Sequence, residues 1–257
     1  MELQGKTAII TGGASGLGEA TVRHFVSLGA KCAIFDINEE RANSIIADVG
    51  AENAVFFPVD VTKTETIEAA IAGTMEAYGA IHICCNYAGI GSAEKTLGKN
   101  GPANLDAFKQ VIDINLVGTF DVLRLAAAEM AKNEPLTDCG CRGVIMNTAS
   151  VAAYEGQIGQ AAYSATKGGI VGMTLPIARD LSSIGIRVNT IVPGLIHTPL
   201  FDLIPDELYK SLESQALFPQ RLGKPEEIAR LAQYFVENDY MNGECVRMDA
   251  GIRMQPR

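Results

Sequence analysis

The sequence of 257 residues lacks the features of a membrane or nucleic-acid-binding protein. No uninterrupted apolar run reaches the ~18 residues needed to cross a bilayer. The first residues show no basic segment followed by an apolar one, so we expect neither a signal peptide nor a transit peptide. Basic residues are the scarcer charge, since 21 Lys and Arg against 30 Asp and Glu give a net charge of −9. We therefore expect no nucleic-acid partner and no membrane partner.

The chain also has few residues that could bind a metal. It contains three histidines and six cysteines. Cys139 and Cys141 form a spaced pair, but no second pair and no histidine cluster completes a zinc site, so we expect no metal. A chain that is 47% hydrophobic can bury a large core without disulfides. Free thiols in a reducing compartment are therefore expected.

What the sequence does contain is an alternation of apolar, β-rich runs with helical patterns. We expect strands at residues 7–10, 31–35, 54–58, 81–85, 143–147, 186–191 and 244–248. We expect helices at residues 18–28, 39–49, 64–78, 105–130, 161–181 and 225–236. The strands are continuously apolar, as in a parallel sheet covered on both faces, and no linker divides the chain. The prediction is one α/β domain over residues 1–257, with a doubly wound seven-stranded parallel sheet and helices on both faces.

Three stretches, at residues 91–104, 133–142 and 198–221, resemble insertions into this pattern. The first and third fall where a doubly wound sheet places its ligand loops, beyond the carboxyl ends of the strands. We expect residues 198–221 to form a lid over the substrate.

A glycine-rich loop joins the first expected strand to the first expected helix. Its candidate ligand-binding residues are Gly12, Ser15, Gly16, Leu17 and Gly18. Glycines permit a tight turn and let the backbone approach a pyrophosphate, which then meets the positive end of the helix. Glycines also serve ordinary turns, but the order of strand, loop and helix is the one that a dinucleotide site requires.

Asp36 ends the second expected strand, 18 residues after Gly18. A carboxylate at that place can accept hydrogen bonds from ribose hydroxyls and would repel a 2′-phosphate. Ile37 follows it, so the sequence offers no basic residue to such a phosphate. The expected cofactor is therefore NAD rather than NADP.

Four polar residues form a candidate catalytic set. Tyr163 and Lys167 lie four residues apart in an expected helix and so share one face. A phenol has a pKa of about 10. A neighbouring ammonium, together with the positive nicotinamide ring of an oxidised cofactor, favours the phenolate, which would act as a general base. Lys167 could also hold the nicotinamide ribose. Ser150 could orient the substrate oxygen, and Asn115 could bind a water that links Lys167 to solvent. Taken alone, a Tyr and a Lys four residues apart are also typical of a solvent-exposed helix face without catalytic function.

Several motifs together resemble the short-chain dehydrogenases/reductases. They are the loop 11–18, Asp60 with Val61, residues 86–89, Asn115, Ser150, Tyr163 with Lys167, and Pro193 with Gly194. The resemblance covers the whole chain and implies a single-domain Rossmann fold. It also implies further cofactor contacts. Asp60 and Val61 would contact the adenine, and Asn86, Ala88 and Gly89 would flank the adenosine ribose. Ile196 and Thr198, which follow Pro193 and Gly194, would contact the nicotinamide carboxamide.

Residues 147–157, 159–163, 168–180 and 253–256 resemble a narrower branch of the family. That branch uses NAD to oxidise (S)-3-hydroxyacyl-CoA to 3-ketoacyl-CoA, as a homotetramer. The resemblance implies that Gln157 and Gln160 lie beside the substrate with Ser150 and Tyr163. Animal mitochondrial members carry a longer N-terminus, which is absent here, so a cytoplasmic location is expected.

Alternatives remain open at this point. Tyr87 stands where relatives often have a small residue or Asn, and it could narrow the site near the adenosine. Residues 198–221 are only loosely similar to the branch, so the substrate could instead be a steroid, an aromatic alcohol or a CoA ester from aromatic degradation. A non-catalytic partner subunit is a third hypothesis, although such proteins usually lose part of the catalytic set, which is intact here.

Overall fold

The computed structural model describes residues 1–198 and 205–256. Seven parallel strands form one sheet in the order β3-β2-β1-β4-β7-β8-β9. These strands are β1 (Thr7–Thr11), β2 (Lys31–Asp36), β3 (Ala54–Pro58), β4 (Ile83–Asn86), β7 (Gly143–Thr148), β8 (Ile186–Pro193) and β9 (Cys245–Met248). The order reverses direction between β1 and β4, which is the switch point where such sheets bind ligands.

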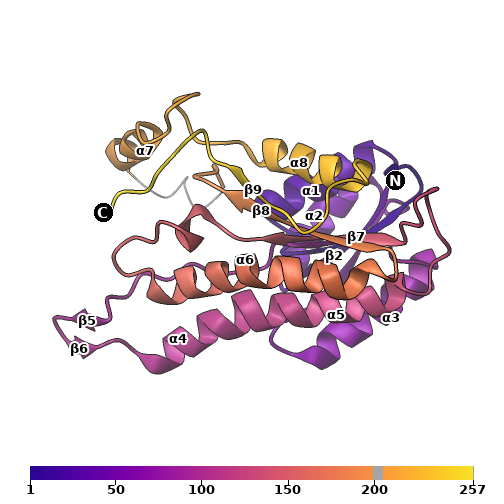
Figure 1. The fold of residues 1–257 in the computed structure, drawn as a ribbon, viewed down its shortest axis with the longest axis horizontal. Helices are drawn as coiled ribbons and strands as arrows, with labels where there is room; N and C mark the ends of the chain where they lie inside the picture. Colours follow the sequence, from indigo (N-terminus) through magenta and orange to yellow (C-terminus); the bar gives the residue numbers. More distant parts are fainter. Residues whose placement is uncertain (199–204, 257) are drawn as a thin grey trace.

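Helices cover both faces of the sheet (Figure 1). One face carries α1 (Gly16–Ser27), α2 (Glu39–Val49) and α8 (Pro225–Glu237). The other carries α3 (Thr64–Tyr78), α5 (Gly118–Met130) and α6 (Ala161–Ser182), with α4 (Leu105–Ile112) packed on α6. The expected doubly wound α/β fold is confirmed.

Alternating side chains of each strand supply the two cores. Ile10 and Ile34 pack beneath α1 and α8, while their neighbours Ile9 and Ala33 pack against α3 and α5. Successive strand residues point to opposite faces, and helices cover both faces, so most strand positions are apolar. This is the reason for the continuous apolar runs in the sequence.

The expected helix 105–130 has a wider turn in its middle. The π-helical segment η1 (Asp113–Val117) joins α4 to α5, and Asn115 is fully buried within it. Single π turns of this kind are frequent at functional sites. The period of apolar residues predicts a helix here but not its local widening, because the widening follows from contacts with other segments.

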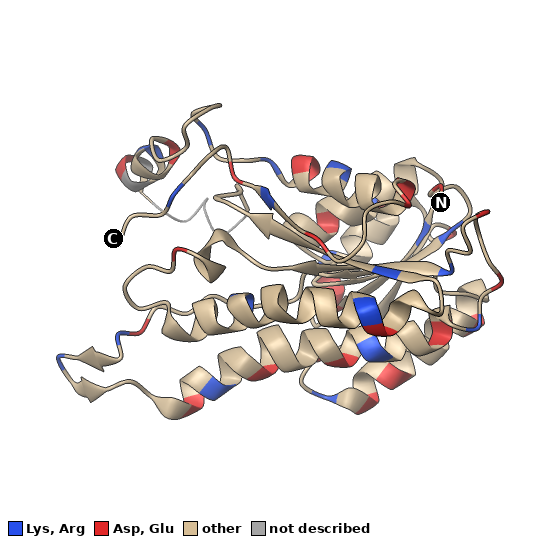
Figure 2. Ribbon diagram, in the orientation of Figure 1, with Lys and Arg blue, Asp and Glu red and all other residues tan. Residues whose placement is uncertain are grey.

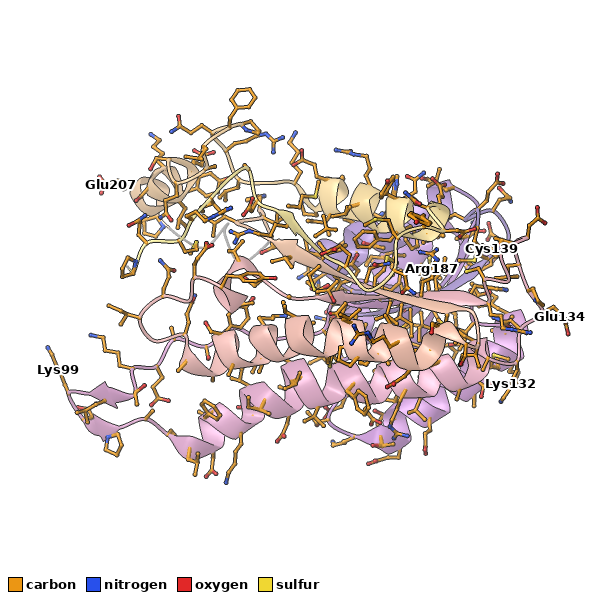
Figure 3. All side chains as sticks on the ribbon, viewed as in Figure 1. Lys99, Lys132, Glu134, Cys139, Arg187 and Glu207 are labelled. Atoms are coloured by element: carbon orange, nitrogen blue, oxygen red, sulfur yellow. The ribbon has the colours of Figure 1, made fainter. Side chains whose placement is uncertain are left out.

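The three insertions have different structures. Residues 91–104 contain the short strands β5 (Leu97–Gly98) and β6 (Gly101–Pro102), a hairpin that projects from the body with Lys99 at its tip (Figures 1 and 3). Residues 133–142 form a loop, and Arg142 N–H donates to the carbonyl of Gly185. The third contains α7 (Asp206–Glu213) at the same end of the molecule as the hairpin. Residues 199–204 of the expected lid lie outside the described residues.

Charge is mixed over the surface. Lys and Arg are interspersed with Asp and Glu along the helices (Figure 2). Among the described helices, none is long and apolar enough to cross a membrane.

Candidate functional site

A groove of about 660 Å³ lies beyond the carboxyl ends of β1, β2, β3 and β4. Twelve of the predicted cofactor residues line it: Gly12, Ser15, Gly16, Leu17, Gly18, Asp36, Ile37, Asp60, Val61, Ala88, Gly89 and Thr198. Its other walls are Phe35, Arg41, Val59, Tyr87, Ile90 and Ile114, which sequence reasoning did not assign to the cofactor.

The phosphate loop is built so that only glycine fits at two positions. A Cβ on Gly12 would lie 2.9 Å from the Ala88 nitrogen, and Gly12 has a φ of 62°. A Cβ on Gly18 would lie 2.2 Å from the Gly12 oxygen. The side chain of Ser15, the N-cap of α1, makes no capping hydrogen bond. The first N–H groups of α1 therefore face the groove without a side-chain acceptor, which fits an anionic pyrophosphate.

The carboxylate of Asp36 is held at the end of β2 by two backbone groups. Ala14 N–H donates to Oδ2 and Asn38 N–H donates to Oδ1, each at 3.0 Å. Ile37 beside it is 80% exposed. Arg41, in the first turn of α2, lines the same groove. The sequence-based inference considered only Ile37 and did not weigh Arg41, and the expected preference for NAD over NADP stays a prediction.

Besides Tyr163 and Lys167, which are also predicted to bind the cofactor, four predicted cofactor residues do not line this groove. Asn86 is buried, and its Nδ2 donates to Asn147 Oδ1 at 3.0 Å. A Cβ on Gly194 would meet Asp249, and Ile196 lines a separate cavity of about 170 Å³ beneath α7. Pro193 ends β8. The expected contacts of these four residues with a cofactor stay predictions.

The catalytic pair lies in the first two turns of α6. Lys167 Nζ is 5.5 Å from the centroid of the Tyr163 ring and donates to the Thr148 carbonyl at 2.8 Å. Ser150 follows β7, and its Oγ accepts from Ala152 N–H at 3.1 Å, which begins the turn η2 (Val151–Ala153). The structure thus brings Ser150, Tyr163 and Lys167 together from two elements.

Burial dominates the electrostatics of this pair. It raises the pKa of Tyr163, and a hydrogen bond with Ser150 acts in the opposite direction. It lowers the pKa of Lys167 to about 8. The phenolate expected from the neighbouring ammonium is therefore not favoured by the protein alone, because removing the phenol from water outweighs its polar contacts.

Asn115 connects η1 to the loop after β4. Its Oδ1 accepts from Ile90 N–H at 2.8 Å, and its Nδ2 donates to the Ile90 carbonyl at 2.9 Å. Nδ2 also lies 3.3 Å from Thr166 Oγ1, next to Lys167 in the chain. The amide thus holds one wall of the groove beside the catalytic helix. Its expected role as a water-binding relay stays a prediction.

The two glutamines expected beside the substrate are engaged by other groups. Gln157 Nε2 donates to the Gln255 carbonyl, and Gln160 Oε1 accepts from Gln157 N–H. The Ile158 N–H donates to the Pro256 carbonyl at 3.0 Å. The loop that follows η2 is therefore tied to the C-terminal segment.

An ionic cluster reinforces this tie. Arg247 Nη1 lies 2.7 Å from Glu155 Oε1, and Arg247 Nη2 lies 2.7 Å from Asp249 Oδ2. These contacts join β9 to the loop that follows Ser150, and sequence spacing gives no signal for them, because the partners lie 92 residues apart.

No group of three or more His, Cys, Asp or Glu side chains that could hold a metal occurs within residues 1–198 and 205–256.

Comparisons with known proteins show the family of this chain. The family model described as "short chain dehydrogenase" matches residues 6–208. The 3-hydroxyacyl-CoA dehydrogenase type-2 of Homo sapiens is 51% identical over 256 residues, covering 99% of this chain and 97% of the relative. A 2,5-dichloro-2,5-cyclohexadiene-1,4-diol dehydrogenase of Sphingobium indicum is 35% identical, covering 98% of each chain.

A solved structure extends the likeness to three dimensions. The crystal structure of 3-hydroxyacyl-CoA dehydrogenase type-2 from Mycobacterium avium superposes with a TM-score of 0.93 at 40% identity, covering 98% of each chain. With a family match over most of its length and relatives of this identity, the chain belongs to the short-chain dehydrogenase family and is an oxidoreductase.

Proposed function

We propose that this protein is an NAD-dependent dehydrogenase that oxidises (S)-3-hydroxyacyl-CoA to 3-ketoacyl-CoA in fatty acid metabolism. The observation that carries the proposal is the placement of Ser150, Tyr163 and Lys167 at the sheet edge that also holds the Asp36 groove. The names of the relatives at 40–51% identity support the acyl-CoA substrate.

The residues of the chain have distinct tasks in this reaction. The hydroxyls of Ser150 and Tyr163 hydrogen-bond the substrate hydroxyl and orient it, and Tyr163 then accepts its proton. Lys167, fixed by the Thr148 carbonyl, holds the nicotinamide ribose and, with Asn115, passes the proton toward water. An oxidised nicotinamide supplies the positive charge that lowers the pKa of the Tyr163 phenol and accepts a hydride from the carbinol carbon.

The choice of NAD rests on Asp36. Its carboxylate is held rigidly by Ala14 and Asn38, so it can accept from both ribose hydroxyls but cannot turn away from a 2′-phosphate. Arg41 weakens this discrimination, because its guanidinium lines the same groove.

A second substrate class is favoured by one comparison. The Sphingobium indicum relative is named as a dehydrogenase of a chlorinated cyclohexadiene diol, so a free cyclic alcohol is the alternative to a CoA ester, with the same chemistry. The intact Ser150, Tyr163 and Lys167 set stands against a non-catalytic partner subunit.

We also propose a homotetramer in a reducing compartment such as the cytoplasm. Apolar side chains on the outer face of α4, η1 and α5 support an association of subunits: Leu105, Phe108, Val117 and Phe120 are 38–63% exposed. All six cysteines are free thiols, which supports the reducing compartment.

The test is the appearance of NADH at 340 nm with NAD and a panel of (S)-3-hydroxyacyl-CoA esters, beside free cyclic alcohols and steroids. Oxidation of the CoA esters alone is the expected result. Oxidation of free alcohols alone would overturn the acyl-CoA substrate, and no oxidation of either class would contradict the enzymatic proposal.

A further inference from the structure

Tyr87 forms part of the groove wall that follows β4. Its N–H group lies 3.3 Å from the Thr11 carbonyl and 3.1 Å from Thr11 Oγ1. The N–H of Ala88 donates to the same Oγ1 at 3.1 Å. The backbone of this wall is therefore attached to the end of β1, the strand that leads into the phosphate loop.

The side chain of Tyr87 reaches across to α1. Its phenol oxygen lies 3.0 Å from Thr21 Oγ1, and Thr21 Oγ1 donates to the Leu17 carbonyl at 2.8 Å. The Thr21 hydroxyl therefore points between two acceptors, the Leu17 carbonyl and the phenol oxygen of Tyr87. The result is a chain of two hydrogen bonds from the wall after β4 to the first turn of α1.

The donor of this chain is protected from water, since Thr21 is fully buried, while Tyr87 is half-buried at the groove. Burial raises the pKa of the Tyr87 phenol, which therefore stays protonated. Within residues 1–198 and 205–256, this is the one side-chain hydrogen bond between residues 86–90 and α1. The two walls are also in close contact, since a Cβ on Gly12 would lie 2.9 Å from the Ala88 nitrogen.

We propose that Tyr87 is a positioning residue for the dinucleotide, which sets the first turn of α1 against residues 86–89 before the ligand arrives. Leu17 lines the groove, so a fixed Leu17 carbonyl fixes the neighbouring N–H groups that would meet the pyrophosphate. A wall already in its bound conformation loses less entropy on binding, which tightens the complex. The inference rests on the proposed dinucleotide-binding function and adds a residue to it.

Three variants of the full-length protein test the proposal by titration with NADH. Tyr87→Phe keeps the ring and removes the acceptor, while Thr21→Val keeps the shape and removes the donor of both hydrogen bonds. We expect each to raise the dissociation constant about three- to tenfold, the effect of one neutral hydrogen bond. Thr21→Ser keeps a hydroxyl and should retain the wild-type affinity. In turnover, KM for NAD should rise more than kcat falls.

The double variant and a control complete the design. Thr21→Val removes both hydrogen bonds, including the one that Tyr87→Phe removes, so the double variant should weaken binding little more than Thr21→Val alone. Tyr234→Phe on α8 removes a hydroxyl that Asn238 contacts at 2.6 Å, far from the groove, and should leave the affinity unchanged.

The outcomes separate this inference from the proposed function. A melting temperature that falls in Tyr87→Phe and Thr21→Val while the NADH dissociation constant stays at the wild-type value would overturn the positioning role. A wild-type protein that binds neither NADH nor NADPH would instead overturn the proposed function, and this inference with it.

Discussion

Lys167 Nζ donates to the main-chain carbonyl of Thr148, the last residue of β7, at 2.8 Å. This hydrogen bond ties the catalytic helix to the strand that leads to Ser150. Lys167 is only 6% exposed, and burial lowers its pKa to about 8. The structure thus holds an ammonium that titrates near the working pH of an enzyme, next to a phenol that burial keeps protonated.

The pKa of Lys167 predicts a pH-dependent stability. Between about pH 8 and 10.5 the unfolded chain binds a proton at this lysine that the folded chain does not, so stability rises with pH in this window. We expect the melting temperature of Lys167→Met to exceed that of the wild type most below pH 8, with the difference narrowing toward pH 10.5. Over this pH window, the contribution of Lys167 to the free energy of unfolding should change by about 3 kcal/mol. A difference between the two proteins that is constant with pH would contradict a buried ammonium.

Replacing Tyr163 by Phe should remove the proton acceptor and keep the fold. We expect kcat/KM for alcohol oxidation to fall at least ~10²-fold, while the affinity for NADH changes little. Steady-state assays beside an NADH titration measure both. Tyr240→Phe, at a fully exposed tyrosine, is the matched control. Near-full activity of Tyr163→Phe would contradict its assignment as the general base.

His82 predicts a loss of stability in acid. Its Nδ1 accepts from Thr7 N–H at 3.0 Å, and burial and Lys6 lower its pKa to about 4. The folded state therefore favours the neutral ring, and the stability that this provides is present above pH 6.5 and is lost as the pH falls toward 4.

Thermal melts of the wild type and of His82→Gln between pH 7 and pH 4 test this prediction. The wild type should lose more stability than the variant over this range. His24→Gln, which changes a ring that contacts Gln233 on α8, should follow the wild type. Parallel curves for the wild type and His82→Gln would show that His82 does not titrate with unfolding.

The choice between NAD and NADP should depend on Asp36 and Arg41 together. Asp36→Ser removes the charge that repels a 2′-phosphate and leaves Arg41 in the same groove to bind it. We expect kcat/KM with NADP to rise about tenfold or more. Adding Arg41→Ala should abolish that gain, and Arg41→Ala alone should change turnover with NAD little. A gain that survives in the double variant would exclude Arg41 as the phosphate ligand.

The sequence alone determines the larger part of the fold and much of the site. Apolar runs, helical periods and the loop 11–18 are local signals, so they predict the strands, the helices and the phosphate-binding turn. The spacing of Tyr163 and Lys167 is equally local, because residues four apart in a helix share one face. Twelve of the predicted cofactor residues line one groove because they end a strand or belong to the segment that follows one, and parallel strands end at one edge.

Only the tertiary structure decided the contacts between distant segments. Tyr87 meets Thr21 across 66 residues, and Gln157 turns to the carbonyl of Gln255 across 98. Arg41, in the first turn of α2, lines the same groove as Asp36. The raised pKa of Tyr163 likewise depends on its burial among packed elements. No local pattern encodes such pairs, since packing, and not spacing along the chain, brings their atoms into contact.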